Sequence, residues 1–170
     1  LKSIEKGTFS SCHKLTSMVI PKSVTSIGNY SFSHCFSIKH IYISNSVRTI
    51  GDRAFVGCSG LTEIIIPISV STIGDSAFLG CSGLTTIIIP FSITCINKCT
   101  FSYCSSLTTL SIPYSIITIG NYAFSGCTGL TTIDIPESVT TIGNFAFSQC
   151  TGLTTLKLPE SLISIEYYAF

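Results

Sequence analysis

Charged side chains are scarce in this chain of 170 residues. Only 10% of the residues are Asp, Glu, Lys or Arg, and the formal net charge is +1. A field this weak does not attract the phosphates of a nucleic acid or an anionic membrane surface strongly. We therefore expect no nucleic-acid partner.

The chain also lacks a long apolar run. Hydrophobic residues make up 45% of it, yet runs such as Ile64–Ile66 and Ile87–Ile89 are only as long as a strand. A membrane-spanning helix needs about 18 apolar residues or more, so we expect no direct membrane insertion of this segment. Polarity comes mainly from hydroxyl groups, on 27 Ser and 21 Thr.

Residues that carry enzyme chemistry are few and scattered. The chain has eight acidic residues, and it contains no Gly-rich phosphate loop, no nucleophile elbow and no paired carboxylates. His13 and His34 each adjoin a cysteine, and His40 falls on an expected strand, whereas a metal site needs several converging ligands. We therefore expect no enzymatic activity, no cofactor and no metal site.

What the chain does have is a repeat of 23 residues. Seven cysteines keep this step: Cys12, Cys35, Cys58, Cys81, Cys104, Cys127 and Cys150. Eight phenylalanines, from Phe9 to Phe170, and eight isoleucines, from Ile4 to Ile165, keep it too. A fixed period of this length indicates stacked units, each unable to bury its apolar face alone. Residues 1–170 are therefore predicted to form one solenoid of about seven coils; because both ends fall within a repeat, we expect an excerpt of a longer array.

One coil can be followed from Leu130 to Cys150. The segment L-x-x-I-x-I alternates apolar and polar residues, which is typical of a strand with one buried face, and Pro136 ends it because proline donates no N–H. A second short strand follows, with Val139 and Ile142 facing inward. Gly143 is expected to adopt a positive φ. The last stretch, up to Cys150, is too short for an α-helix and is predicted to form a turn or one 3₁₀ turn.

Stacking such coils about 4.8 Å apart aligns the apolar residues into continuous columns. The period predicts a right-handed, mainly β solenoid with a parallel sheet built from the L-x-x-I-x-I segments, and almost no helix. Each Phe fills its coil as a plug.

The motif L-x-x-L-x-L-P followed by I-G-x-x-A-F-x-x-C resembles the leucine-rich repeats of the BspA-like surface antigens, whose period lies in the known range of about 20–29 residues. The resemblance covers the whole chain. It implies a leucine-rich-repeat superhelix that is secreted or displayed on a cell surface and takes part in adhesion to host matrix proteins and epithelial cells, without enzyme chemistry.

The cysteine column allows two interpretations. Neighbouring coils place equivalent Cα atoms about 5 Å apart, within the range for a disulfide. However, each cysteine has two equivalent neighbours and seven cannot all pair, so we expect small apolar fillers instead. Cys95 and Cys99 stand outside the column, where a local disulfide or a reactive thiol is the alternative.

The outward face of the main sheet carries the candidate binding residues. Tyr42, Ile65 and Ile88 are predicted to form an apolar stripe on three adjacent strands, flanked by His40 and Glu63. Exposed contiguous apolar surface is typical of a contact site. The alternative is that these side chains are tolerated β-formers with no partner.

Three functions follow. The first is a cell-surface or secreted module that binds a host matrix or cell-surface protein. The second is an intracellular scaffold for a signalling protein, because nine cysteines without a pairing plan suit a reducing cytoplasm. The third is a structural array element that associates with itself.

Overall fold

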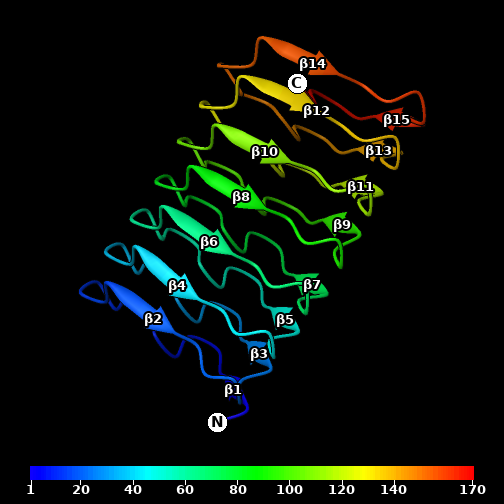
Figure 1. Cartoon of the computed structure of the whole chain (residues 1–170). Helices are drawn as coiled ribbons and strands as arrows, with labels where there is room; N and C mark the ends of the chain where they lie inside the picture. Colours follow the sequence, from blue (N-terminus) through cyan, green and yellow to red (C-terminus); the bar gives the residue numbers. More distant parts are fainter.

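The computed structural model describes all residues, 1–170, and consists of strands and turns without helices. Figure 1 shows stacked coils, each contributing a longer strand to one side and a two-residue strand to the other. The longer strands are β2 (Ser17–Val19), β4 (His40–Tyr42), β6 (Glu63–Ile65), β8 (Thr86–Ile88), β10 (Thr109–Ser111), β12 (Thr132–Asp134) and β14 (Thr155–Lys157). The short strands are β1 (Ser3–Ile4), β3 (Ser26–Ile27), β5 (Thr49–Ile50), β7 (Thr72–Ile73), β9 (Cys95–Ile96), β11 (Thr118–Ile119), β13 (Thr141–Ile142) and β15 (Ser164–Ile165).

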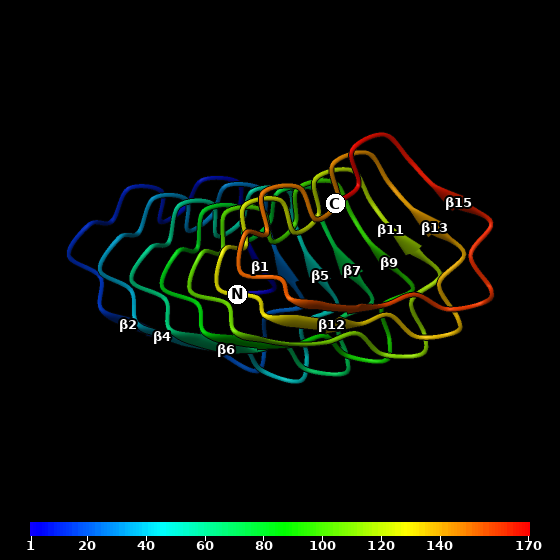
Figure 2. The same cartoon turned by 90° about the horizontal axis from the view of Figure 1, so that it is seen from above.

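All strand pairs are parallel and pair residues that are 23 apart. The longer strands form a five-stranded sheet from β2 to β10 and a separate pair, β12 and β14. The short strands form two four-stranded sheets, β1 to β7 and β9 to β15. Figure 2 shows each coil rotated relative to the one before it, as expected from the natural twist between parallel strands. The predicted mainly β solenoid of about seven coils is confirmed.

The interior consists of the predicted columns. Side chains of Phe32, Phe55, Phe78, Phe101, Phe124 and Phe147 are at most 1% exposed. Adjacent rings in this column stack with centroids 5.2–5.5 Å apart. Ile, Val, Leu, Ala and Cys columns complete a continuous core of 45 buried residues. Burial of these columns by neighbouring coils provides the main stabilising term.

The segment around the Phe plug forms successive turns, and the 3₁₀ alternative is not realised. Ala146, Ser148 and Cys150 donate their N–H groups to carbonyls three residues earlier, each at 3.2 Å. The intervening N–H groups bond the next coil, as Phe147 does to Ala169 O at 2.6 Å. Two residues of the segment, Phe145 (φ 56°) and Gln149 (φ 60°), are left-handed.

The expectation of a positive φ at Gly143 is wrong, because the left-handed residues lie two and six positions later. Glycine is needed at this position for a different reason. A Cβ on Gly143 would lie 2.8 Å from Asn121 N and 2.9 Å from the carbonyl carbon of Gly120, both in the preceding coil. The constraint is therefore the close approach of two backbones.

Asn97 occupies the equivalent position in its coil and shows how the pairing of two coils changes where glycine is absent. Gly120 donates its backbone N–H to Ile96 O in the preceding coil, at 2.7 Å. Asn97 instead donates its side-chain amide to the equivalent carbonyl, Ile73 O, also at 2.7 Å. The sheet of short strands is interrupted at this place, between β7 and β9.

Candidate functional site

The outer face of the longer strands presents two columns of side chains. In most of these strands the middle residue is buried and the two outer residues are exposed. We call the two outer rows the first and the last column. The first column is Ser17, His40, Glu63, Thr86, Thr109, Thr132 and Thr155. The last column is Val19, Tyr42, Ile65, Ile88, Ser111, Asp134 and Lys157.

Four exposed apolar residues are consecutive in the last column. Tyr42, Ile65 and Ile88 are 61%, 72% and 68% exposed, and Val19 is 68% exposed. Backbone register pairs Val19 with Tyr42, Tyr42 with Ile65, and Ile65 with Ile88. The outward orientation of the predicted residues is thus confirmed, and the stripe extends one strand further than the sequence indicated. We call these four residues the apolar stripe.

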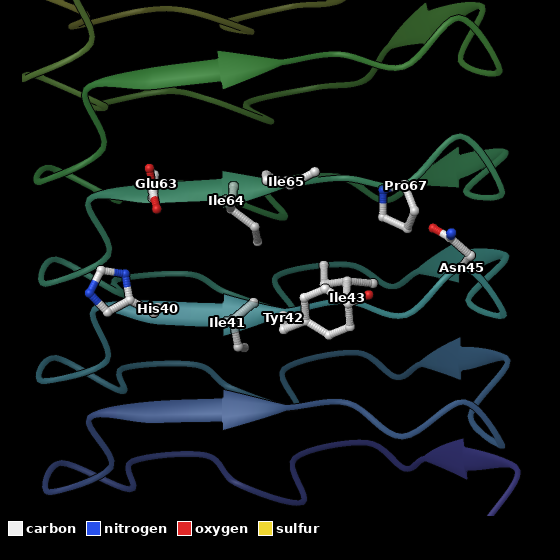
Figure 3. A pocket seen from close by; sticks show the side chains of 9 residues that line it. All are labelled: His40, Ile41, Tyr42, Ile43, Asn45, Glu63, Ile64, Ile65 and Pro67. Carbon is white, nitrogen blue, oxygen red and sulfur yellow. The ribbon is translucent and has the colours of Figure 1, made fainter.

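A groove of about 410 Å³ lies between β4 and β6 beside the stripe. Figure 3 shows His40 and Glu63 at one end of the two strands, Tyr42 and Ile65 further along, and Asn45 and Pro67 at the other end. Four of the predicted site residues therefore line one groove. Ile88, on β8, extends the apolar surface beyond it.

Weakened pairing of these two strands accompanies the groove. Between β4 and β6 only Tyr42 and Ile65 are paired, whereas β6 and β8 pair over three residues. The bond from Thr62 N to Lys39 O is 3.5 Å long, compared with 3.1 Å for the equivalent bond from Thr85 N to Thr62 O. Strands β4 and β6 are therefore paired over fewer residues than β6 and β8.

The C-terminal half of the same face is polar. The first column continues as Thr109, Thr132 and Thr155, and the last column ends in an exposed ion pair with 3.8 Å between Lys157 Nζ and Asp134 Oδ1. The hollow at this half, about 270 Å³, lies beside the interruption between β10 and β12 and is lined in part by these two charged residues.

A second aromatic surface was not predicted. Tyr122, Phe145 and Tyr168 stack at 4.8 and 5.2 Å on the turn segments, away from the sheet. Tyr103, Tyr122 and Phe145 all line a hollow of about 490 Å³. The signal was present in the sequence, because three aromatic residues follow one another at intervals of 23.

The cysteine column has a polar role in addition to filling space. Each buried thiol donates to the carbonyl of the Phe in the preceding coil, as Cys58 Sγ does to Phe32 O at 3.0 Å and Cys127 Sγ to Phe101 O at 3.2 Å. Burial raises the pKa of Cys58 and of Cys104 from 9.0 to about 12. These groups therefore stay protonated at neutral pH, as their donor role requires.

Cys95 and Cys99 are partly exposed. Cys95 Sγ donates to Asn97 Oδ1 at 3.4 Å. Burial raises the pKa of both thiols. At Cys95 the carboxylate of Asp75 adds to this effect, whereas at Cys99 the charge of Lys98 and a hydrogen bond with Ser76 oppose it. A reactive thiol requires a lowered pKa, so the direction of the shift does not favour that alternative; the reactive thiol and the local disulfide both stay predictions.

No group of three or more His, Cys, Asp or Glu side chains is placed to hold a metal ion. No helix of the structure could cross a membrane.

A family model described as the BspA type leucine rich repeat region, with six copies, matches residues 1–108 and 95–170. The chain belongs to this family. Among proteins of curated function no match is found.

Solved bacterial structures share the fold. A leucine-rich repeat protein from Bacteroides ovatus is 36% identical over 98% of this chain, with a TM-score of 0.94. One from Eubacterium ventriosum is 32% identical over 94% of the chain, with a TM-score of 0.86. The chain spans 43% of the length of each. A leucine rich cell surface protein from Faecalibacterium prausnitzii is 28% identical over 93% of this chain and 57% of its own, with a TM-score of 0.55.

Proposed function

We propose that this BspA-type solenoid is a cell-surface or secreted binding module that contacts a host matrix or cell-surface protein through its apolar stripe. The observation that carries the proposal is the row of four exposed apolar side chains, in register, beside a groove. Surface of this kind is uncommon on a protein without a partner. Tyr42 is the expected anchor, because tyrosine is enriched among residues that dominate binding energy.

The thiols do not argue against a location outside the cell. Nine cysteines without a defined disulfide pairing are typical of a reducing cytoplasm, but a thiol with a raised pKa supplies little thiolate for oxidation. Column cysteines that are buried and bonded to carbonyls are therefore compatible with an oxidising environment. The cell-surface relative from Faecalibacterium supports the same location.

The test replaces three stripe residues with serine, as Tyr42→Ser, Ile65→Ser and Ile88→Ser together. We expect binding to epithelial cells and matrix proteins to be lost, because the apolar contact is removed while the core is untouched. The parent's binding should depend weakly on salt, since the stripe is uncharged. Binding is measured on labelled protein at dilute concentration.

Thr109→Ser, Thr132→Ser and Thr155→Ser together form the matched control on the polar half of the same face. This control should bind like the parent, and circular dichroism should show both variants folded. Unchanged binding by the stripe variant would place the contact elsewhere, with the aromatic surface at Tyr122 and Phe145 as the next candidate.

A further inference from the structure

The apolar stripe and the two polar residues beside it, His40 and Glu63, are arranged symmetrically about the groove between β4 and β6. His40 and Glu63 lie at the same end of adjacent strands, one on each side of the groove between β4 and β6 (Figure 3). The chain's one ion pair joins Lys157 to Asp134, so Glu63 has no cationic partner within the chain. The centre of the stripe falls between the same two strands, because Val19 and Tyr42 lie on one side of it and Ile65 and Ile88 on the other.

We infer that the stripe is self-complementary and that two copies of this chain pair face to face over it. The two-fold axis would run parallel to the strands, midway between β4 and β6. This rotation places β4 opposite β6 of the second copy, and β2 opposite β8, while each column faces its own counterpart. A two-fold interface of this kind uses the same patch on both copies.

The rotation matches the side chains in chemistry. In the last column Tyr42 meets Ile65 of the second copy, and Val19 meets its Ile88. In the first column an imidazole N–H of His40 meets the carboxylate of Glu63 of the second copy, and symmetry provides this contact twice. Apolar residues thus face apolar residues, and each hydrogen-bond donor faces an acceptor. The two identical surfaces are therefore complementary in polarity and charge.

The same geometry accounts for the end of the stripe at β8. Two twisted sheets that pack face to face diverge away from their crossing point. The divergence is the same on both sides of the axis, and strands β10 to β14 lie farther from it than β2 to β8, so Ser111, Asp134 and Lys157 would remain in water. Four strands about 4.8 Å apart make a small contact, so the dimer belongs to the weak, reversible class.

This inference rests on the stripe that the proposed function assigns to a partner, and it adds regulation of that surface. At high local density a second copy covers the stripe. A host protein then competes with the second copy for the stripe, so binding of the chain to the host protein falls as the density of the chain rises.

The experiment measures self-association of the purified chain by sedimentation velocity, in a series that reaches the millimolar range. An acidic variant carries His40→Glu, which places Glu opposite Glu63. A basic variant carries His40→Lys and Glu63→Lys. Each variant alone should self-associate about tenfold more weakly than the parent, because like charges face each other. An equimolar mixture should restore association as a one-to-one heterodimer.

The matched controls carry the same charges on the polar half of the first column: Thr109→Glu with Thr132→Glu, and Thr109→Lys with Thr132→Lys. Both should associate like the parent. A parent that stays monomeric throughout, variants that associate normally alone, or a mixture that stays monomeric would each overturn the inference. If the chain associated through its coil ends instead, these substitutions would not affect association. The variants would then associate normally alone, which is one of the results that overturn the inference.

The proposed function is tested separately, at dilution and on cells. If self-association is absent but the triple serine variant loses binding, the proposed function stands and the dimer does not exist. If self-association follows the charge rule but the triple variant binds cells normally, the dimer stands and the partner site lies elsewhere.

Discussion

The N-terminal and C-terminal halves of the outer sheet face have the same backbone and different surfaces. Across β2 to β8 the last column is Val, Tyr, Ile and Ile; across β10 to β14 it is Ser, Asp and Lys. Both halves cover the same Phe, Ile and Cys columns. The fold therefore does not require apolar residues on the outer face, and their presence in one half is the basis of the proposed contact.

The largest expected effect tests whether the two halves share one interior. Phe78→Ala and Phe124→Ala each remove a fully buried ring, and each should lower the free energy of unfolding by about 3–5 kcal/mol, because neighbouring coils cannot close the cavity. Urea denaturation followed by circular dichroism measures the change. Phe91→Ala, at a ring that is 66% exposed, is the control and should cost far less. A large effect in only one half would mean that the cores differ, and the comparison would fail.

The interior was predictable from the sequence because its rules are local and repeat. Period-two alternation identified both strands of each coil, and the 23-residue step identified the Phe and Cys columns. The outward positions of Tyr42, Ile65 and Ile88 followed from the same alternation. Each of these inferences depends only on which face of a strand a residue occupies.

Features that depend on two neighbouring coils were not predictable in the same way. The glycine at 143 was assigned to a torsion angle, whereas the structure shows that the backbone of the preceding coil excludes a Cβ there. The thiol donors were missed, since the Phe carbonyl that accepts from each Cys lies 26 residues earlier. The groove was missed because it coincides with a local loss of pairing between β4 and β6, which the repeat pattern does not encode.

The thiol column runs through both halves and gives the second prediction. For Cys58 and Cys104 the folded-state pKa is raised to about 12 from 9.0. A raised pKa stabilises the fold fully below pH 9, and that contribution is lost as the pH rises towards 12, because only the unfolded chain releases the protons. Each such thiol should reduce the free energy of unfolding by about 1.4 kcal/mol per pH unit in this window.

The measurement is urea denaturation at a series of pH values between 8 and 12, for the parent and for Cys58→Ala and Cys104→Ala. Each variant should be less stable than the parent at pH 8 and should lose stability less steeply above pH 9. All other side chains are common to the three proteins, so the difference in slope reports the thiol that was removed. If one variant has the parent's slope, its thiol is not held protonated, and the column is not uniform along the chain.

The smallest expected effect concerns the ion pair of the polar half. Lys157 and Asp134 are 3.8 Å apart with side chains 73% and 78% exposed. Water screens such a pair, so Lys157→Ala should change the free energy of unfolding by no more than about 0.5 kcal/mol. Binding to cells should also be unchanged, because the pair lies beyond the end of the stripe. A loss of binding as large as that of the triple serine variant would show that the contact spans both halves, and the apolar stripe would then be only one part of a longer interface.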